Sequence, residues 1–179
     1  MIQRLYITGF MTSGKSTIGP ILANVIGWAF KDLDKEIEKA EGMPVVEIFS
    51  QKGEEYFRKI EHEFLLDLSE ENLLVLSLGG GTIINKNNLS LMKSTGKIVY
   101  LKSSPEMIYQ RVKNKIDRPI FRDLVLSDKS TPQDFISRIK ELQKVREPYY
   151  SAADFSIDTD KTRIGVTVDN LVKILRKHI

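Results

Sequence analysis

The residues from Gly9 to Ser16, Gly-Phe-Met-Thr-Ser-Gly-Lys-Ser, fit the phosphate-loop pattern G-x-x-x-x-G-K-[ST] at every fixed position. Glycines in such a loop let backbone N–H groups curl around phosphates, and the helix that follows adds the partial positive charge of its N-terminus. Lys15 is suited to bridge the β- and γ-phosphates, and the Ser16 hydroxyl is suited to ligate Mg²⁺. The alternative is a chance glycine-rich turn, but a strand is predicted before the motif and a helix after it, as the motif requires. The chain is therefore predicted to bind a nucleoside triphosphate.

Two carboxylates, Asp32 and Asp34, lie at the end of a second predicted strand, residues 28–33. In an open α/β sheet the carboxyl ends of the strands form the ligand-binding edge, beside the phosphate loop. The period of two in a strand predicts that both carboxylates point the same way. One carboxylate would then hold a metal ion and the other would accept a proton from an attacking hydroxyl. The alternative is that either residue only caps the next helix.

Arg58 lies on a predicted helix whose apolar face carries Phe57, Ile60 and Phe64. Glu61 follows about one turn later, where its carboxylate could hold the guanidinium in place. A fixed planar guanidinium is suited to bidentate binding of a carboxylate. The alternative is a surface Arg–Glu pair worth under ~1 kcal/mol, which is the commoner arrangement in proteins.

Three consecutive glycines, Gly79 to Gly81, directly follow the third predicted strand, which is apolar. Glycines at a strand end permit a ligand to approach the backbone closely, with N–H groups available to bind oxygens. A tight turn explains the same glycines equally well.

The elements that must position these residues alternate between strands and helices. Strands are expected at residues 4–8, 28–33, 73–77, 97–101 and 155–158. Helices are expected at residues 15–26, 34–41, 54–68, 88–94 and 168–175, with a helical turn over 44–49 and further helices that begin near Pro105 and Pro132. Residues 113–131 show neither periodicity and are interpreted as a mobile excursion. The alternation predicts an α/β domain with a parallel sheet, and it leaves the strand order open.

The composition excludes several classes of protein. The chain has 179 residues, which suits a single domain, with 41% hydrophobic and 28% charged residues. No apolar run approaches the ~20 residues of a membrane helix, and the first ten residues do not form a signal peptide. The absence of cysteine excludes disulfides and cysteine-ligated metals and fits the cytosol, and two histidines leave little room for a histidine-based triad. The net charge of +3 is spread along the chain, which favours a small anionic substrate over nucleic acid.

Together these features resemble the shikimate kinase family over nearly the whole chain. The segments that carry the resemblance are GFMTSGKSTIG (9–19), DLD (32–34), EIF (47–49), FRKIE (57–61), LSLGGG (76–81), RP (118–119) and REPYY (146–150). The phosphate loop alone is generic. The D-x-D, the F-R-x-x-E and the triple glycine at these spacings are specific.

The resemblance implies a five-stranded parallel sheet flanked by helices on both faces, as in the nucleoside monophosphate kinases. It implies one domain over residues 1–179, with a substrate-binding segment at about 33–61 and a mobile lid at about 112–124. It further implies transfer of the γ-phosphoryl group of MgATP to the 3-hydroxyl of shikimate, which gives shikimate 3-phosphate and ADP in chorismate and aromatic amino-acid biosynthesis. A cytoplasmic monomer that acts on shikimate and ATP, with no nucleic-acid or membrane partner, is expected.

Motif by motif, the resemblance also implies which residues form the site. The implied ATP-binding residues are Thr12, Ser13, Gly14, Lys15, Ser16, Thr17, Arg111, which would stack on adenine, and Arg118 from the lid. The implied acceptor-binding residues are Asp34, Phe49, Phe57, Arg58, Gly79, Gly80, Gly81 and Arg146. The implied catalytic residues are Lys15, Asp34 as candidate base, and Arg118. Ser16 and Asp32 would organise Mg²⁺.

Two segments depart from the family pattern. The lid reads RPIF (118–121) rather than the more usual RPLL, which is a mild change. Thr12 stands where the family usually has glycine. If that position has a positive φ, a β-branched residue there costs ~1–2 kcal/mol.

Two alternative functions are considered. The first is a different small-molecule kinase of the same fold, such as gluconate kinase, because gluconate also carries a carboxylate and hydroxyls that Arg58 and Arg146 would bind. The D-x-D, F-R-x-x-E and L-S-L-G-G-G segments argue against it. The second is a nucleotide-binding regulator without activity, against which the presence of Lys15, Ser16 and Asp34 argues.

Overall fold

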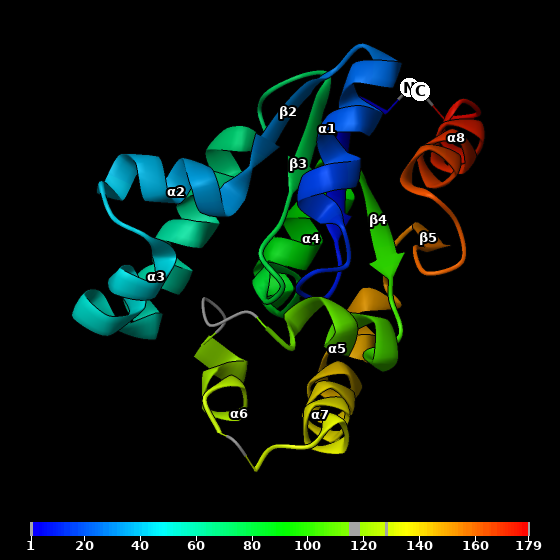
Figure 1. Ribbon diagram of the computed structural model, residues 1–179. Coiled ribbons are helices and arrows are strands. Elements are labelled where there is room, and N and C mark those ends of the chain that lie inside the picture. Colours follow the sequence, from blue (N-terminus) through cyan, green and yellow to red (C-terminus); the bar gives the residue numbers. More distant parts are fainter. Residues whose placement is uncertain (1, 115–118, 128, 179) are drawn as a thin grey trace.

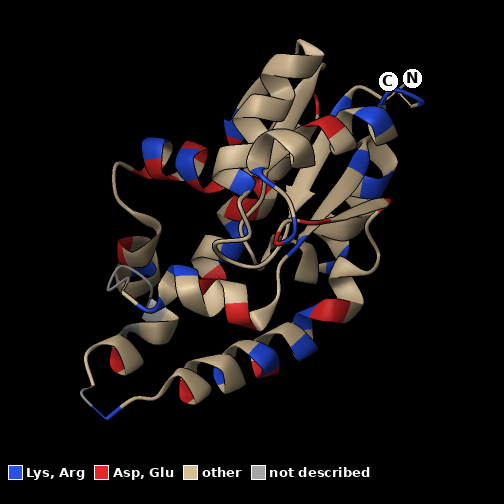
Figure 2. Cartoon of the chain, turned by 45° about the vertical axis from the view of Figure 1, so that its right-hand side comes forward, with Lys and Arg blue, Asp and Glu red and all other residues tan. Residues whose placement is uncertain are grey.

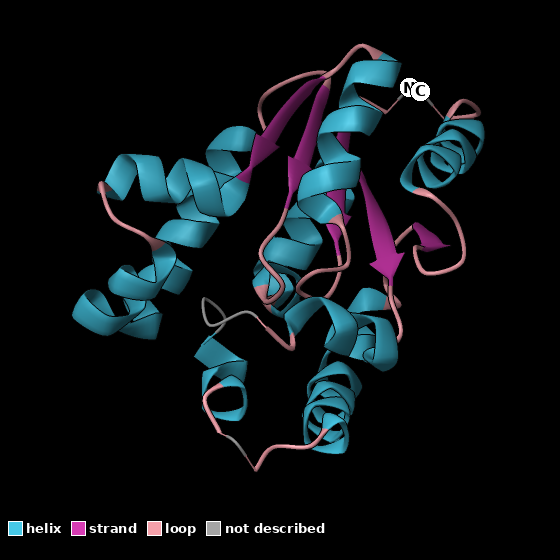
Figure 3. Cartoon of the chain, viewed as in Figure 1, coloured by secondary structure: helices cyan, strands magenta, loops and turns pink. Residues whose placement is uncertain are grey.

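The computed structural model describes residues 2–114, 119–127 and 129–178, and the strands in this part of the chain form one sheet (Figures 1 and 3). The strands are β1 (Arg4–Thr8), β2 (Ala29–Asp32), β3 (Leu74–Ser77), β4 (Lys97–Lys102) and β5 (Phe155–Asp158). Each pair of neighbours is parallel, and the order is β2-β3-β1-β4-β5. Because β1 has β3 on one side and β4 on the other, the loop after β1 lies where ligands bind in open parallel sheets.

Helices connect these strands and follow the predicted pattern closely. They are α1 (Lys15–Ile26), α2 (Leu33–Glu41), α3 (Val45–Leu68), α4 (Lys86–Thr95), α5 (Pro105–Val112), α6 (Arg122–Val125), α7 (Pro132–Tyr150) and α8 (Ile164–Leu175), with 3₁₀ turns η1 (Thr82–Ile84) and η2 (Pro119–Phe121). The predicted starts of α5 and α7 are confirmed. Ser104 caps α5 with its side chain, and Thr131 forms a capping box with Asp134 at α7.

The two faces of the sheet are covered by different helices, which confirms the predicted architecture. In β1, Tyr6 belongs to the apolar cluster formed with α2, α3 and α4, whereas Leu5 and Ile7 belong to the cluster formed with α1 and α8. This alternation follows from the period of two in a strand. All three side chains have no exposed surface, so the middle strand is buried on both faces.

A third apolar cluster ties the phosphate loop to the helices below it. Phe10 packs with residues of α5 and α7, and Phe121 of η2 is fully buried in the same cluster. Figure 1 shows α5, α6 and α7 gathered below the carboxyl ends of the strands. The predicted excursion at 113–131 contains η2 and α6, which the sequence did not predict because elements of three and four residues show no periodicity.

Four strand boundaries differ from the prediction by one residue. Strand β2 begins at Ala29 rather than residue 28, and β4 ends at Lys102 rather than residue 101. Strand β2 ends at Asp32 rather than residue 33, because Asp32 is already the N-cap of α2. Strand β3 begins at Leu74 rather than Leu73, because Leu73 has a left-handed backbone with φ 54°.

Helix α3 is interrupted at Gly53, whose φ of 85° and ψ of 167° are not helical. The interruption explains why the sequence predicts a turn over 44–49 and a separate helix from residue 54. Glycine is required there because other residues rarely adopt this φ. The break brings the rings of Phe49 and Phe57, which lie on either side of it, to 4.6 Å between centroids.

Charged residues of both signs share the same elements. Figure 2 shows Lys and Arg beside Asp and Glu along most helices of the described chain. Across residues 2–114, 119–127 and 129–178, we find no helix that is both long and apolar enough to cross a membrane.

Candidate active site

A cleft of about 980 Å³ lies at the carboxyl edge of the sheet. Three segments far apart in the sequence line it: the loop after β1 with the start of α1, the junction of β2 and α2, and the turn after β3. Its further lining residues are Lys35, Glu38, Val45, Val46, Arg111, Arg146, Thr159, Ile164 and Thr167. The topology therefore brings the phosphate loop, the acidic pair and the triple glycine to one place, as the sequence predicts.

The phosphate loop meets the cleft with its backbone and with one lysine. Gly14, with φ 103°, is the N-cap of α1 and provides no side-chain cap, so the first turn of α1 lies open to the cleft lining. A helix N-terminus of this kind attracts anions. Lys15 Nζ donates to the carbonyl oxygens of Gly9 and Phe10, at 2.7 and 3.1 Å. The ammonium group is thus held over the loop.

Thr12 has a left-handed backbone with φ 59°, so its position does carry the strain expected of a non-glycine residue. Its carbonyl oxygen accepts a hydrogen bond of 2.7 Å from Arg111 Nη1. This bond from α5 holds the strained peptide in place. It also places Arg111 beside the phosphate loop, where the family resemblance puts a nucleotide-binding arginine.

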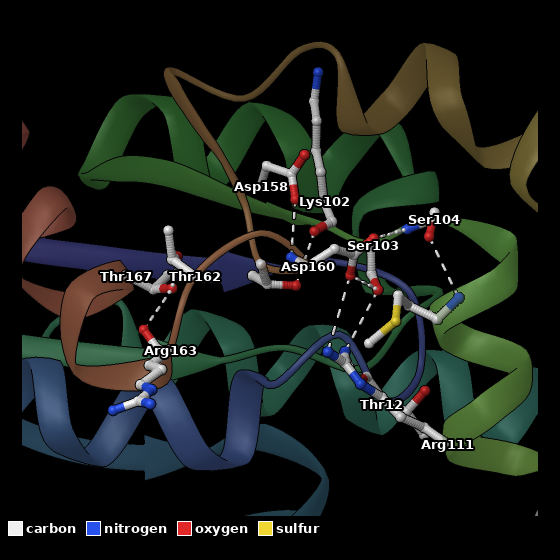
Figure 4. A network of polar contacts seen from close by, with 12 residues as sticks. Thr12, Lys102, Ser103, Ser104, Arg111, Asp158, Asp160, Thr162, Arg163 and Thr167 are labelled. Atoms are coloured by element: carbon white, nitrogen blue, oxygen red, sulfur yellow. Dashed lines mark hydrogen bonds and ion pairs between the residues drawn. The ribbon is translucent and has the colours of Figure 1, made fainter.

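Arg111 is anchored on its other side by a loop that the sequence leaves unassigned (Figure 4). Asp160, after β5, lies 3.9 Å from Arg111 Nη2 and accepts bonds of 2.6 Å each from Ser103 Oγ and the backbone N–H of Ser104. Burial raises the pKa of Asp160, but these hydrogen bonds outweigh it and hold the pKa below its usual range. The sequence signal for Asp160 is its place just after the carboxyl end of β5, two residues past Asp158, because ligands bind at this edge of a parallel sheet.

The acidic pair reaches the cleft, but not in the predicted way. Asp34 lies in the first turn of α2 and not in the strand, so the expectation that a strand period of two aligns Asp32 with Asp34 is wrong. Asp32 caps α2, accepting from the backbone N–H of Lys35 at 3.3 Å, and still lines the cleft. The structure thus shows Asp32 as the cap of α2, and its place in the cleft lining is compatible with a second role in the site.

The surroundings of Asp34 raise the pKa of its carboxyl. Burial raises the pKa of its carboxyl most, and the nearby charges of Asp32 and Glu61 raise it further, while Lys15 lowers it; the result is a pKa of about 6. A carboxylate with this pKa is mostly charged at neutral pH and close to the range in which general bases work best.

The triple glycine serves close approach and not a left-handed turn conformation. None of Gly79–Gly81 has a φ in the left-handed range. A β-carbon on the first glycine would lie 2.9 Å from Asp34 Oδ1, on the second 3.2 Å from Arg146 Nη1, and on the third 2.9 Å from Arg58 Nη2. Three charged side chains from α2, α7 and α3 thus converge on this one turn, and side chains on the turn would displace them.

Arg58 is half-buried, with a side chain that is 34% exposed, and it pairs with one buried and one exposed carboxylate. Its Nη1 donates to Glu61 Oε2 at 3.0 Å, and the Glu61 side chain is only 1% exposed. Its Nε and Nη2 donate to Glu54 Oε1 at 3.3 and 3.2 Å. The guanidinium carbon lies 5.8 and 5.4 Å from the ring centroids of Phe49 and Phe57. Because the Glu61 carboxylate is buried, the Arg58–Glu61 pair differs from an ordinary pair of two exposed side chains.

The predicted acceptor residues divide into two groups. Asp34, Gly79–Gly81 and Arg146 line the cleft, whereas Arg58, Phe49 and Phe57 are not part of its lining and form a cluster that adjoins it at Gly81. Phe57 is 3% exposed and belongs to the core. The lid arginine, Arg118, lies outside the described residues.

Tyr150 contacts the glycine turn, although the sequence analysis includes it only in the segment REPYY and assigns it no role. Its hydroxyl donates to the carbonyl oxygen of Gly80 at 2.9 Å, and its side chain is fully buried. Arg146, one turn earlier on α7, contacts Tyr150 and has its guanidinium carbon 5.4 Å from the ring centroid of Phe10. Tyr150 therefore fixes the second glycine against the arginine that faces it.

The donors available to a Mg²⁺ ion are few and fit one that arrives with a nucleotide. Ser16, on the first turn of α1, and Asp32 both line the cleft with oxygen donors. Mg²⁺ is commonly held by one or two protein oxygens together with phosphates and water. Among residues 2–114, 119–127 and 129–178, no group of three or more acidic or histidine side chains could hold a metal on its own.

Fold and site together define a class of protein. A parallel sheet of order 2-3-1-4-5, a phosphate loop after its middle strand, and an adjoining pocket of a carboxylate and arginines are the arrangement of a phosphate-loop phosphotransferase of the nucleoside monophosphate kinase type.

Comparisons with known proteins identify the family. A family model described as shikimate kinase matches residues 11–176. The shikimate kinase of Chloroherpeton thalassium is 43% identical over 175 residues, which cover 98% of this chain and 93% of the relative. A structure of Acinetobacter baumannii shikimate kinase in complex with shikimate superposes with a TM-score of 0.84 at 31% identity, covering 100% of this chain and 96% of that chain. The chain belongs to the shikimate kinase family, whose members are ATP-dependent kinases that phosphorylate shikimate.

The gluconate kinase alternative receives support for the fold alone. A gluconokinase from Sinorhizobium meliloti superposes with a TM-score of 0.56 at 15% identity, covering 98% of this chain and 92% of that chain. The shared architecture explains why the two activities are hard to separate from the phosphate loop alone.

Proposed function

We propose that this chain transfers the γ-phosphoryl group of MgATP to the 3-hydroxyl of shikimate, a step toward chorismate and the aromatic amino acids. The observation that carries the proposal is the convergence of Asp34, Arg58 and Arg146 on the turn Gly79–Gly81 beside the phosphate loop. Shikimate has one carboxylate and several hydroxyls. A site for shikimate therefore needs guanidinium groups to bind its carboxylate, and a carboxylate and backbone N–H groups to bind its hydroxyls.

The nucleotide half of the site is proposed to be the loop residues 12–17 together with Arg111. Backbone N–H groups at the start of α1 and the Lys15 ammonium would bind the phosphates, since both carry positive charge at the cleft. Arg111, already beside the loop, would contact the adenine. Arg118 is proposed to reach the phosphates from a lid at 112–124. Its charge would stabilise the transferring group.

In the acceptor half, polar groups are proposed to bind the substrate and aromatic side chains to enclose its ring. Arg58 and Arg146 would bind the shikimate carboxylate, and the N–H groups of Gly79–Gly81 would bind its hydroxyls. Phe49 and Phe57 would wall the ring, with the partly buried Phe49 toward the ligand and Phe57, which is 3% exposed, packed behind it near the Arg58 guanidinium.

Asp34 is proposed to orient the attacking hydroxyl and to accept its proton. Its carboxylate lies between the phosphate loop and the glycine turn, and its pKa of about 6 leaves it charged at neutral pH. Phosphoryl transfer passes through a loose transition state that needs little help from a base. Orientation of the acceptor is therefore expected to be the larger part of its contribution.

Mg²⁺ is proposed to be held by Ser16 and Asp32, which meet the oxygen preference of this ion at the cleft. When bound, it supplies neutralisation of the phosphate charge. Ser16 and Asp32 would position it, and the chain's own cations would complete the neutralisation.

The enzyme is further proposed to act as one domain over residues 1–179 and as a cytoplasmic monomer. In the described chain, all three apolar clusters adjoin one sheet or its phosphate loop. The large exposed hydrophobic residues are distributed over several elements and include Ile21, Val25, Val145 and Leu126. Light scattering during gel filtration tests the monomer, for which one 20.5 kDa species is expected.

A coupled assay of ADP release tests the proposed reaction. Shikimate, gluconate and no acceptor are compared at the same MgATP concentration, with a Mg²⁺-free arm. We expect ADP release that requires both shikimate and Mg²⁺, with gluconate at the level of no acceptor. Equal rates in the three acceptor arms would overturn the proposal, and a product phosphorylated at another hydroxyl, seen by NMR, would correct its position.

A further inference from the structure

The first residue of η1, Thr82, follows the glycine turn directly and is fully buried. Its hydroxyl donates to Glu61 Oε1 at 2.7 Å, and the other carboxylate oxygen, Oε2, accepts from Arg58 Nη1 at 3.0 Å. One carboxylate thus joins the hydroxyl that follows the turn to the guanidinium that faces the turn. The side chain of Glu61 is 1% exposed, so water does not compete for either oxygen.

A buried carboxylate is costly unless both of its oxygens are hydrogen-bonded. Within the described residues, the hydrogen bonds to the Glu61 carboxylate come from Arg58 and Thr82. The terminal torsion of a glutamate side chain is soft and has no sharp preference. With the hydroxyl removed, Oε1 would lack its donor, the carboxylate would rotate to share the guanidinium, and Arg58 would lose its orientation.

The backbone of Thr82 is tied to the same helix by a second path. Asn88 Nδ2 of α4 donates to the Thr82 carbonyl oxygen at 3.1 Å, and Asn88 Oδ1 accepts from His62 Nδ1 at 2.6 Å. His62 is the neighbour of Glu61 on α3. The four side chains therefore close a ring from α3 through η1 and α4 back to α3. This ring fixes both the hydroxyl and the carbonyl of Thr82.

We infer that Thr82 is a positioning residue for the acceptor: its hydroxyl sets the orientation of Glu61 and, through it, of the Arg58 guanidinium against the glycine turn. The turn and the guanidinium lie so close that small rotations matter, since a β-carbon on Gly81 would lie 2.9 Å from Arg58 Nη2. This inference rests on the proposed role of Arg58 in binding the shikimate carboxylate. Nothing in the D-x-D, F-R-x-x-E or triple-glycine patterns includes Thr82.

Steady-state kinetics of Thr82→Val and Thr82→Ser test the inference. Valine keeps the shape and removes the hydroxyl, whereas serine restores it. We expect Thr82→Val to raise the KM for shikimate about tenfold, with the KM for ATP within about twofold, because only the acceptor cation loses its support. Thr82→Ser is expected to return the shikimate KM to within about threefold of the parent, as a donor to a charged group is regained.

Thr95→Val is the matched control. Thr95 also uses its hydroxyl in side-chain bonding, to Tyr6 at 2.7 Å, but it lies at the end of α4 near the amino end of β1. Thr95→Val should lower the melting temperature without changing the KM for shikimate or the KM for ATP. A Thr82→Val protein whose two KM values rise together with a similar loss of melting temperature would show general loosening, which overturns the inference.

Arg58→Lys, assayed in parallel, separates this inference from the proposed function. If Arg58→Lys raises the shikimate KM and Thr82→Val does not, Thr82 has no positioning role and the role of Arg58 stands. If neither variant changes the shikimate KM, the assignment of Arg58 fails, and the inference fails with it. Combined in one chain, Thr82→Val should add little to Arg58→Lys, because both act through the same guanidinium.

Discussion

The nucleotide half and the acceptor half of the cleft are built in different ways. The phosphate loop relies on backbone and on one ammonium, and the buried hydroxyls of Thr8 and Ser13 have no hydrogen-bond partner within the described residues. On the acceptor side, Glu61, Thr82 and Tyr150 are buried and hydrogen-bonded to the groups they support. The acceptor half is thus held in shape by neighbouring side chains before any ligand binds, which lowers the entropy lost on binding. In the nucleotide half, side chains support the loop through the Arg111 bond to the Thr12 carbonyl oxygen and the Lys15 bonds to Gly9 and Phe10, and the phosphate-facing surface itself is main chain.

Asp34 lies where the halves meet, and its ionisation reports on both. Lys15 of the phosphate loop lowers its pKa, while Glu61 of the acceptor side raises it. Changes to either half should therefore alter the pH dependence of the other.

The largest expected effect is that of Lys15→Met, which removes the one side-chain cation of the phosphate loop. We expect kcat to fall by about 10³-fold, because the lysine charge is required as the phosphoryl group moves. The coupled ADP assay measures the fall. Lys173→Met, which removes an exposed lysine of α8, should behave as the parent. Near-normal turnover in Lys15→Met would show that backbone alone suffices in this half.

Asp34→Asn is expected to lower kcat by about 10- to 100-fold, since orientation is retained and charge is lost. In the parent, kcat/KM for shikimate should fall as pH drops through about 6, because the carboxyl then takes up a proton. The variant should lack this inflection. A parent profile that is flat from pH 5 to 8 would contradict the role of the charged carboxylate.

The same shift has a consequence for stability. The folded-state pKa of Asp34, about 6, lies above the unfolded value near 3.8, so the folded state binds more protons between these pH values. The stability that this group contributes is present below pH 3.8 and is lost as pH rises through about 6. Denaturant titrations should therefore show Asp34→Asn more stable than the parent at pH 8, with the advantage shrinking toward pH 4. An equal difference at both pH values would contradict it.

Arg58→Lys sharpens the acceptor side of the comparison. Lysine keeps the charge but cannot make the two bonds of a planar fork, so we expect the shikimate KM to rise about tenfold with the ATP KM unchanged. Arg4→Lys, at the opposite end of the sheet, where Arg4 bonds to the carbonyl oxygens of Thr95 and Glu71, is the control. A rise of both KM values to the same extent would show that the halves are not independent.

The smallest effect is expected for Thr12→Gly. Relief of the positive φ is worth ~1–2 kcal/mol, but glycine adds ~0.4–1 kcal/mol of unfolded-state entropy, so the free energy of unfolding should rise by about 0 to 1.6 kcal/mol. The ATP KM should change by less than about threefold, because the Arg111 bond reaches the backbone carbonyl and not the side chain. Denaturant unfolding and initial rates measure the two quantities. A tenfold loss of ATP affinity would assign a binding role to the threonine side chain.

Sequence reasoning found the strands and the elements that carry the site, because buried strands and capped helices leave local patterns. It did not find the strand order, since an apolar strand carries no record of its neighbour. It wrongly aligned Asp34 with Asp32 by applying the strand period two residues past the end of β2. Thr82 and Asn88 escaped notice because their partners on α3 are 21 and 26 positions away, and no local spacing records such contacts.

The break at Gly53 has a consequence for how such enzymes diverge. On an unbroken helix, positions eight apart stand about 12 Å apart along the axis, yet the rings of Phe49 and Phe57 lie 4.6 Å from each other. The backbone at Gly53 thus brings together the two rings that lie 5.8 and 5.4 Å from the Arg58 guanidinium carbon. A change in the backbone angles at Gly53 would move Phe49 relative to Phe57 and leave the phosphate loop unchanged. Related enzymes would thereby select a different alcohol while they bind the phosphates in the same way.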